Sequence, residues 1–565
     1  MKSFALFPTV YNADGTPSLR LSIHRGIYFL LLFVLVSSQP VSNYMMSASE
    51  ILLMLNWILE LDIRQKFKTV KFPEINDSKL KRFRFLSYQH PLFWFFLVFA
   101  AVHVVWLLST QNMDYGMNDL FKKLPLLAIP IVVLTSRPLN KQQLSLIMSL
   151  YVLSVFVATI IGRVRYATMP DLPYREIIPY ISHIRFSLNV CLAVVFLVAF
   201  MVVGWKRYIY ASNKIEFNWY WLVEAFVAAV VISLLGFLLI IRSYTAMVIL
   251  FVVGIILIAV FWHRIVSHTV RIAVLLFFLV LIGTATGIFF SMSTDYYRMI
   301  PLARQPLPQY TANGNPYSHQ QNGLVENGNY VDNYVCIEEL QSEWAKIGTL
   351  GLGDTTVNGY AVFPTLIRYL NAKGVTKDSV GMQVLTAADV QAIEKGIANP
   401  VYLTGSSLRR MVYVLLYEYE SSRCLNAVKN FTVLQRLELW RNGWRVFTKC
   451  PLFGTGTGDV VDACHIQLSL DNSALKGTTK HIHNQYLTLL VTFGIFGFLI
   501  IAITFVWALR RERILDNPIV LAYLAIVLIS FVSEDTLETL AGAVFSVLFM
   551  TIFAAQKKEL KSLTQ

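Results

Sequence analysis

Two histidines and an asparagine stand at the start of a long apolar run, at residues 481–490, which read HIHNQYLTLL. The run continues to residue 500, so these polar side chains lie at the N-terminal end of a segment with membrane-spanning character. Structural membrane helices usually begin behind Trp, Tyr, Lys or Arg side chains instead. An imidazole in this place is suited to binding a metal or carrying a proton, and interfacial polarity is the simpler alternative.

Other ionisable side chains border or interrupt apolar runs elsewhere in the chain. Arg185 precedes one run in SHIRFSLN, and Arg242 interrupts another in LLIIRSYT. Three acids, Glu534, Asp535 and Glu538, gather in SEDTLETL between two further runs. Because an ionised group near hydrocarbon is costly, such residues usually face a cavity or a charged partner.

Arginine, histidine and carboxylate together are suited to one kind of group transfer. A guanidinium binds phosphate through two parallel hydrogen bonds and stays charged at every relevant pH. A histidine can accept the proton of a hydroxyl as that hydroxyl attacks. We therefore expect an alcohol to displace a diphosphate leaving group, at a membrane surface where a lipid-linked diphosphate would lie.

Simpler explanations apply to each residue taken alone. Arg185 and Arg242 could be interfacial anchors whose charged ends reach water, and the three acids could mark a solvated turn. His481 and His483 are two positions apart, so one helix face cannot carry both. No Cys or Asp stands beside them at zinc-ligand spacing, so no metal site is expected.

The composition is that of a membrane protein. Of 565 residues, 56% are hydrophobic and 15% are charged, whereas about one quarter is charged in soluble domains. The formal net charge of +14 would suit nucleic acid, but the basic residues lie in short segments between apolar runs. That placement is typical of orientation signals, so no nucleic-acid partner is expected.

The apolar runs predict an all-α polytopic protein of about twelve transmembrane helices. The predicted spans are residues 26–40, 48–62, 91–109, 121–136, 145–162, 186–204, 219–240, 244–262, 271–290, 485–507, 517–533 and 538–554. With twelve spans, the Lys and Arg clusters of the connections all fall on one side, together with both termini. Assigning that side to the cytoplasm satisfies the positive-inside rule throughout.

This topology divides the chain into three parts. Residues 1–290 carry nine spans, residues 291–484 form one large loop domain on the outer face, and residues 485–565 carry the last three spans. Either two disulfides or four unpaired thiols are compatible with the four cysteines of the loop. These are Cys336, Cys424, Cys450 and Cys464.

Several helices are predicted within the loop. Gly374 is expected to end a helix in AVFPTLIRYLNAKG, and Thr386 to begin one over residues 386–397, with Asp389 close to a capping box. A longer helix over residues 430–449 carries arginines at 436, 441 and 445, off one apolar stripe. The residues of that stripe are Leu434, Leu437, Trp440, Trp444 and Phe447.

The segment WRNGWRVFTKCPLFGTGTGD, followed by HNQYLTLLVTFGIFGFL, resembles the O-antigen ligase and polymerase superfamily. The matching positions are Pro451 to Gly456, His483 to Leu487, and Gly494 with Gly497. The predicted topology, with its large outer loop before the tenth span, is similar to that of the ligases. An insert at about 301–400 departs from the shorter ligases and leaves the acceptor open.

The resemblance implies a GT-C-like, inverting, metal-independent glycosyltransferase without a cofactor, at the periplasmic face of a bacterial inner membrane. Its donor would be an undecaprenyl-diphosphate-linked glycan and its acceptor, for a ligase, a lipid A-core sugar hydroxyl. The resemblance implies His483 as the catalytic residue, supported by Asn484, Tyr486, Glu534 and Asp535. The arginines implied to bind the diphosphate are Arg242, Arg185, Arg436 and Arg441.

Other functions are compatible with these features. A protein O-oligosaccharyltransferase or an O-antigen polymerase would use the same chemistry on another acceptor, although polymerases often divide their outer chain between two loops. A lipid-linked glycan transporter is a remote alternative, because its ionisable residues would lie within the spans and not at their outer edge.

Overall fold

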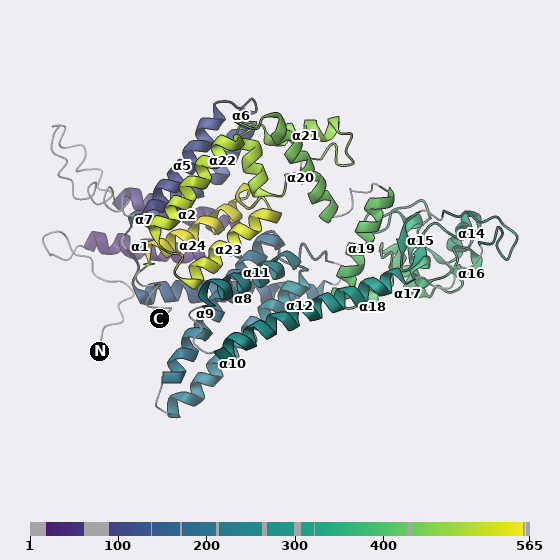
Figure 1. Ribbon diagram of the computed structural model, residues 1–565, viewed down its shortest axis with the longest axis horizontal. Helices are drawn as coiled ribbons and strands as arrows, with labels where there is room; N and C mark the ends of the chain where they lie inside the picture. The colour runs from purple at the N-terminus through teal and green to yellow at the C-terminus, as the bar shows by residue number, and fades with distance from the viewer. Residues whose placement is uncertain are drawn as a thin grey trace. The chain divides into compact units, whose positions relative to one another are not determined.

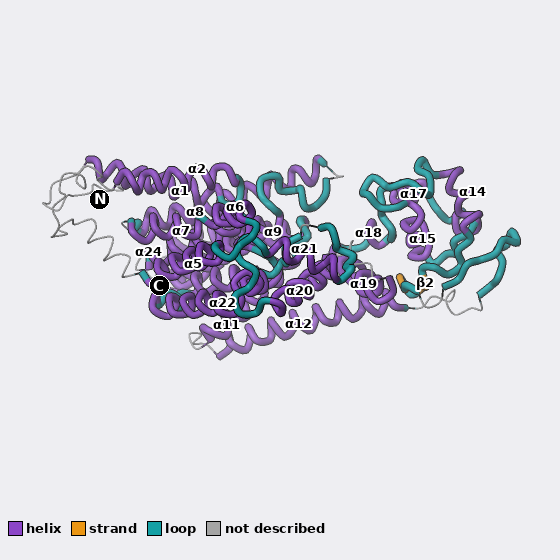
Figure 2. The backbone as a smooth tube through the Cα atoms, turned by 90° about the horizontal axis from the view of Figure 1, so that it is seen from above, coloured by secondary structure: helices purple, strands orange, loops and turns teal. Residues whose placement is uncertain are grey.

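The computed structural model describes residues 19–60, 90–136, 138–169, 172–210, 214–262, 268–298, 307–320, 323–425, 432–478, 480–557 and 560. The basic cluster at residues 64–84 that contributed to the predicted orientation lies outside this set. The described chain is predominantly helical, with loops mainly around the segment from α14 Ile337–Ile347 to α18 Val401–Thr404 (Figure 2), which confirms the all-α class. Within it, one short hairpin pairs β1 Val325–Glu326 with β2 Asn329–Tyr330.

The chain divides into two compact units. Unit 1 comprises Met1–Arg264, Leu439–Asn472 and Lys476–Gln565, and unit 2 comprises Ile265–Glu438 and Ser473–Leu475. The division at residues 290 and 484 inferred from sequence concerns the two sides of a bilayer, and it stays a prediction. The end of the polar loop belongs to unit 1 because residues 439–472 pack on its helices.

Unit 1 is a bundle of apolar helices (Figure 1). Its helices are α1 Leu19–Ser38, α2 Asn43–Glu60, α5 Pro91–Leu107, α6 Met113–Lys123, α7 Pro125–Thr135, α8 Lys141–Thr168, α9 His183–Tyr210, α10 Lys214–Ile240, α11 Tyr244–Phe261, α21 Val460–Leu470, α22 Gln485–Glu512, α23 Pro518–Ser533, the 3-10 helix η2 Thr536–Glu538 and α24 Leu540–Ala555. The last part of α20 Thr432–Lys449 also belongs to this unit.

Within the described residues, six helices are long and apolar enough to cross a membrane. They are α8, residues 183–202 of α9, residues 221–240 of α10, α11, residues 275–297 of α12, and α22. Shorter apolar helices occur at the predicted spans in α1, α5, α23 and α24. The chain is therefore a multi-pass membrane protein, while the count of twelve spans and the GT-C-like class stay predictions.

The fourth predicted span, residues 121–136, does not form one continuous helix. α6 ends at Lys123, and the 11-residue α7 begins at Pro125 and contains Pro130. Proline has no N–H to donate and clashes with the preceding turn, so it divides a segment whose hydropathy looks continuous.

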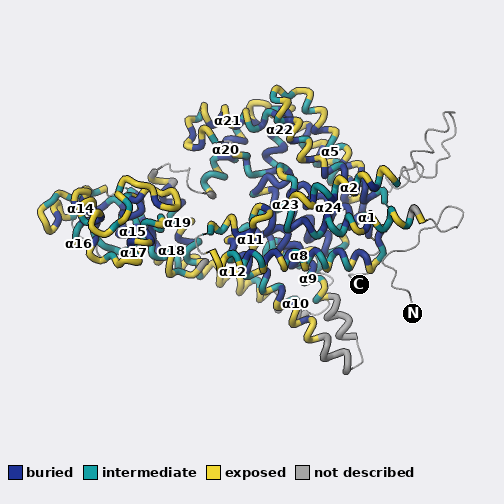
Figure 3. The backbone as a smooth tube through the Cα atoms, turned by 180° about the vertical axis from the view of Figure 1, so that it is seen from behind, coloured by how far each residue is buried: buried dark blue, intermediate teal, exposed yellow. Residues whose placement is uncertain are grey.

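The centre of unit 1 is α24, whose residues from Ala541 to Ala554 are buried along their whole length. It packs against α7 and α23, and both α23 and α24 are predominantly dark blue in Figure 3. Tyr523 of α23 contributes its ring to this core and donates its hydroxyl to the Phe545 carbonyl at 2.7 Å. The acidic turn that joins these two helices is therefore anchored on both sides.

Unit 2 is a separate helical unit with its own apolar core. Its elements are α12 His268–Tyr297, the β1–β2 hairpin, α14 Ile337–Ile347, α15 Val362–Lys373, α16 Ser379–Met382, α17 Ala387–Glu394, α18 Val401–Thr404, α19 Ser407–Leu425 and the first part of α20. Gly374 ends α15 with a left-handed φ of 72°, as predicted. Thr386 and Asp389 form the capping box of α17, which the sequence also predicted.

The apolar stripe predicted for α20 is wrong in part. Leu437 and Trp444 are 52% and 55% exposed, whereas Leu439 and Val446 are buried. The buried face of α20 is therefore rotated from the predicted stripe. Gly443 explains this difference, because a Cβ there would lie 3.1 Å from Ile482 and Leu487. Close approach at a glycine, and not side-chain hydropathy alone, decides which face of this helix is covered.

All five cysteines are free thiols. Cys191, Cys336 and Cys464 are buried, whereas Cys424 and Cys450 are exposed. Of the two alternatives left open by the sequence, the structure therefore has the unpaired thiols.

Candidate functional site

The helix that carries the HNQYL motif is broken. α22 has non-helical torsion angles at Gly494, with φ 62° and ψ −170°. In a continuous helix the amides of Ile495 and Phe496 would bond to the carbonyls of Val491 and Thr492. The break leaves these four backbone groups without their helical partners.

The loop of residues 451–456, PLFGTG, supplies the missing partners. Its first two carbonyls accept the two freed amides at 2.8 and 3.2 Å, and its last two amides donate to the two freed carbonyls at 2.8 and 3.0 Å. A Cβ on Gly454 would lie 2.4 Å from the Thr492 oxygen, and one on Gly494 would lie 2.4 Å from the Leu452 carbonyl. The glycines of both motifs therefore allow one backbone to substitute for the other, as a broken helix in a membrane requires.

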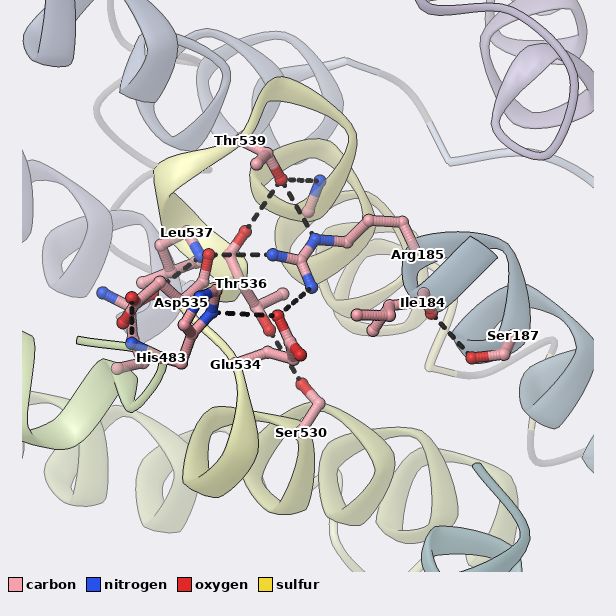
Figure 4. A network of polar contacts seen from close by, with 12 residues as sticks. Ile184, Arg185, Ser187, His483, Ser530, Glu534, Asp535, Thr536, Leu537 and Thr539 are labelled. Atoms are coloured by element: carbon pink, nitrogen blue, oxygen red, sulfur yellow. Dashed lines mark hydrogen bonds and ion pairs between the residues drawn. The ribbon is translucent and has the colours of Figure 1, made fainter. Parts of the chain in front are cut away.

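His483 lies directly before this helix in a left-handed conformation, with φ 56°. Such a conformation costs an L-residue about 1–2 kcal/mol, so it needs support. Asn484 caps α22 by accepting the Leu487 amide at 3.1 Å. The carboxylate of Asp535 accepts the His483 amide at 2.6 Å (Figure 4). It also accepts the Asn484 amide at 3.1 Å and the Thr488 hydroxyl at 2.7 Å.

The His483 side chain faces the neighbouring acid. Its Nδ1 lies 3.7 Å from Glu534 Oε2, and the Arg185 Nη1 lies 3.7 Å from the same oxygen (Figure 4). The imidazole is 34% exposed, whereas the Glu534 side chain is 6% exposed. A histidine with a buried carboxylate behind it and an accessible edge can take a proton, because the carboxylate stabilises the imidazolium that forms.

Arg185 is enclosed by the acidic turn. Besides its ion pair with Glu534, its Nη2 donates to the Asp535 carbonyl at 2.9 Å and its Nε to the Thr539 hydroxyl at 3.1 Å. In this arrangement its guanidinium holds the turn in place. Contact between Arg185 and a diphosphate therefore stays a prediction.

The carboxyl group of Asp535 is buried among several charges. Burial raises the pKa of Asp535 above its usual range, and the negative charge of Glu538 acts in the same direction. The hydrogen bonds from Thr488 and from the His483 amide act against this rise in pKa. These donors are what allow a buried carboxylate to hold the histidine backbone.

Trp440 of α20 also contacts the backbone of His483. Its indole Nε1 donates to the His483 carbonyl at 3.2 Å. The backbone of His483 is thereby held on both sides, by Asp535 at the N–H and by Trp440 at the carbonyl.

A second buried cluster beside the turn was not identified from the sequence. Lys123 Nζ lies 2.5 Å from Asp119 Oδ2 and 2.8 Å from Glu538 Oε2. Gln485 Nε2 donates to the other oxygen of Glu538 at 3.1 Å, and its Oε1 accepts the Leu537 amide at 2.8 Å. The available signal was a lysine and an acid, four residues apart, bordering an apolar run.

Arg242 lies at the turn between α10 and α11. It is exposed and left-handed, with φ 52°, and its guanidinium lies 5.3 Å from the centre of the Tyr174 ring. Such a ring contact is compatible with phosphate binding through the N–H groups. The cooperation of Arg242 with His483 stays a prediction.

The two loop arginines lie on α20 at different exposures. Arg441, in unit 1, is exposed, and Arg436, in unit 2, is half-buried. Arg445 on the same helix pairs with Asp471 at 2.6 Å and lowers the pKa of that carboxyl below its usual range, with Arg441 adding to the effect. The choice between Arg436 and Arg441 as a diphosphate ligand stays open.

Tyr486, predicted to support the histidine, turns away from it. Its hydroxyl donates to the Leu528 carbonyl at 2.9 Å. Its ring lines an apolar cavity of about 150 Å³ whose walls come from α5, α7, α22, α23 and α24. Leu537, two residues after Asp535, also lines this cavity, which therefore begins directly beside the acidic turn.

In the described part of the chain, no three His, Cys, Asp or Glu side chains gather as the ligands of a metal ion would.

Residues 400–502 match a family model described as O-antigen ligase. The matched segment contains α20, the PLFGTG loop, His483 and the broken part of α22. No curated protein matches the chain.

Proposed function

We propose that the chain belongs to the O-antigen ligase family and acts as an O-antigen ligase, because residues 400–502 match a family model of that description. In this reaction a glycan moves from an undecaprenyl-diphosphate carrier to a hydroxyl of a lipid A-core sugar. The observation that carries the proposal is the placement of His483, half-exposed, against the buried Glu534 at the start of a membrane helix.

His483 acts as the general base of this transfer. Its Nδ1 faces Glu534 at 3.7 Å, so the other ring nitrogen is the one to accept the proton of the acceptor hydroxyl. As the proton leaves, the hydroxyl oxygen bonds to the anomeric carbon and the bond to the diphosphate oxygen breaks. The glycan is transferred with inversion, and the lipid diphosphate departs.

Arginine side chains neutralise the charge that develops on the departing diphosphate. Removal of one such donor costs about 3–4 kcal/mol of transition-state stabilisation in well-studied sites. Arg242 is the best-placed candidate, because it is exposed at a predicted outer turn. Arg436 or Arg441 would supply a second donor, and Arg185 contributes by holding Glu534. Because positive side chains supply this charge, the proposed reaction needs neither a metal nor a cofactor.

The apolar cavity beside the acidic turn supports a lipid-linked donor. Its lining is almost wholly aliphatic and aromatic, and the hydroxyls of Tyr486 and Tyr523 in its wall are bonded to backbone carbonyls. Such a cavity stays dry and accepts hydrocarbon. A cavity of about 150 Å³ holds only a short hydrocarbon segment, so the part of the donor tail next to the diphosphate would lie here while the diphosphate stays near the histidine. In the predicted topology this end of the bundle faces the periplasm.

The test is a transfer assay on the purified full chain with an undecaprenyl-diphosphate glycan and three acceptors offered separately. These are lipid A-core, a Ser/Thr-rich protein and a second donor molecule. We expect product on lipid A-core alone, unchanged by a chelator, and at least a 10³-fold loss in His483→Ala. His465→Ala, which changes an exposed histidine of α21, serves as the matched control and should keep full activity.

The other outcomes have defined meanings. Product on the protein or on the second donor would keep the chemistry and replace the acceptor. Full activity in His483→Ala would remove the catalytic assignment. The absence of transfer to every acceptor would return the lipid-linked glycan transporter as the leading alternative.

A further inference from the structure

The Lys123 cluster lies beside the site but takes no part in the chemistry proposed above. Lys123, Asp119 and Glu538 are all buried or nearly so, and the ammonium group bridges the two carboxylates at 2.5 and 2.8 Å. Burial of one cation between two acids is costly unless each charge has partners. A cluster of this kind calls for an explanation other than stability.

Gln485 joins this cluster to the start of α22. It is fully buried and lies two residues after His483. Its amide makes two bonds to the acidic turn, one to the Leu537 N–H at 2.8 Å and one to Glu538 Oε1 at 3.1 Å. The same turn presents Asp535, which accepts the His483 amide at 2.6 Å.

We propose that Lys123 and Gln485 are positioning residues for His483, and that they act through the turn of residues 534–538. Lys123 holds Glu538, and Gln485 holds Glu538 and Leu537, so Asp535 is presented at the place where it supports the left-handed histidine. The expected effect on glycan transfer rests on the proposed function. The expected effect on the backbone of residues 481–488 does not.

The cause of the coupling is the length of the turn. Asp535 and Glu538 are separated by two residues of a 3-10 turn, so a displacement of the backbone at Glu538 reaches Asp535 through a short segment. Removal of Lys123 would leave two buried carboxylates without their cation, and they would separate or take up protons. Arg185 would still hold the Asp535 carbonyl and Thr539, so the effect should stay local.

Four variants of the full chain test this proposal. Lys123→Met removes the charge, and Lys123→Arg keeps a cation with donors for both carboxylates. Gln485→Met removes both amide bonds without a change of charge. Lys122→Met is the matched control, because Lys122 is the exposed neighbour on the same helix and contacts the Tyr115 ring instead.

Two readouts are needed. Amide hydrogen exchange of the peptide covering residues 481–488, without substrate, reports the bonds that the amides of His483 and Asn484 donate to Asp535. Transfer kinetics report the position of the imidazole. We expect Lys123→Met and Gln485→Met to exchange this peptide at least tenfold faster, and to lose about 10- to 100-fold in kcat with little change in the donor KM. Lys123→Arg should recover most of both quantities, and Lys122→Met should match the wild type.

Two results would overturn the proposal. Unchanged exchange of residues 481–488 in Gln485→Met and Lys123→Met would show that the turn does not depend on them. Faster exchange throughout unit 1 would show a general loss of stability and no specific positioning. If Lys123→Met fails to fold, the decision falls to Gln485→Met. A wild-type chain without transfer activity would reject the proposed function, while the exchange data would still decide this inference.

Discussion

At the scale of single residues, the site joins one half-exposed base to buried charges. His483 is accessible, but Glu534, Asp535 and Arg185 around it are not. His483 and Arg242 are also two of the few non-glycine residues with left-handed backbone in the described chain. Local strain of this kind collects where function requires a fixed side-chain direction.

Arg242 offers a test at the scale of a single residue. Its backbone predicts that a substitution by glycine preserves stability, whereas its side chain predicts that the same substitution removes activity. Arg242→Gly should relieve the left-handed strain and raise or preserve thermal stability, by up to about 1 kcal/mol. If the guanidinium binds the diphosphate, the same variant should lose most transfer activity. Arg242→Lys should also transfer poorly, since one ammonium cannot replace a bidentate fork. Thermal unfolding and transfer kinetics on the same preparations measure both effects.

Arg175 provides the comparison for Arg242, because its guanidinium also lies against the Tyr174 ring, at 5.5 Å. Arg175→Lys should keep near wild-type transfer. Loss of stability with full activity in Arg242→Gly would return Arg242 to the role of an interfacial anchor.

At the scale of elements, the broken helix α22 explains why two glycine motifs far apart in the sequence occur together. The backbone of the PLFGTG loop contacts the backbone around Gly494 directly. Neither Gly454 nor Gly494 has space for a side chain. The direction of the first half of α22, which carries the site, is therefore set by this junction.

A methyl group at the junction should disturb it strongly. Gly494→Ala combines a positive φ with a Cβ 2.4 Å from the Leu452 backbone, so we expect a loss of about 2–4 kcal/mol in the free energy of unfolding. Gly283→Ala in α12 is the control, because nothing lies within 4 Å of its Cβ and alanine favours the helix. Equal thermal stability of the two variants would contradict the proposed junction.

Unit 2 should show its own dependence on pH through Lys377. This residue lies between α15 and α16, where its Nζ donates to the Asn333 carbonyl and the Asn371 side chain at 3.0 and 2.8 Å. Burial lowers the pKa of Lys377 to about 7, and Asp332 acts in the opposite direction. The unfolded chain, with a lysine pKa of about 10.4, binds more protons than the folded chain between these values.

The stability of unit 2 should therefore rise as the pH increases from about 7 towards about 10, and this residue should add no further change below pH 7. Protection of residues 323–400 from a protease during thermal unfolding, repeated across this pH range, measures the stability of unit 2. Lys377→Met should flatten the profile, whereas Lys395→Met, at an exposed lysine of the same unit, should leave it unchanged. A wild-type profile as flat as that of Lys377→Met would contradict the prediction.

At the scale of the whole molecule, the two exposed thiols test the topology. Cys424 and Cys450 are free and exposed and lie in the loop predicted to face outward, whereas Cys191, Cys336 and Cys464 are free but buried. A membrane-impermeant maleimide added to spheroplasts should label the first two without a reductant, and the other three only after denaturation. Mass spectrometry of the digested protein measures both.

Two variants complete the labelling experiment. Cys424→Ser and Cys450→Ser should each remove one label. Labelling of these residues only after permeabilisation would reverse the predicted orientation, and a requirement for a reductant would contradict the free thiols.

The sequence by itself determined the features that depend on composition and local chemistry. Hydropathy identified the apolar helices, the positive-inside pattern predicted their orientation, and Thr386 and Gly374 marked helix ends through backbone chemistry that acts within one turn. The HNQYL and PLFGTG motifs also indicated the resemblance to the O-antigen ligase family, and both lie within residues 400–502, which match the family model.

Only the tertiary structure decided which charges meet. Lys123 and Glu538 are 415 residues apart, and Arg185 and Asp535 are 350 residues apart, so no local pattern predicts these contacts. The tertiary structure also placed Arg185 within the acidic turn and directed Tyr486 away from His483. It buries a face of α20 that is rotated from the predicted one, because Gly443 allows close approach there. The physical reason is common to these cases: hydropathy and helix periodicity describe one segment, whereas ion pairs and close glycine contacts depend on the position of another.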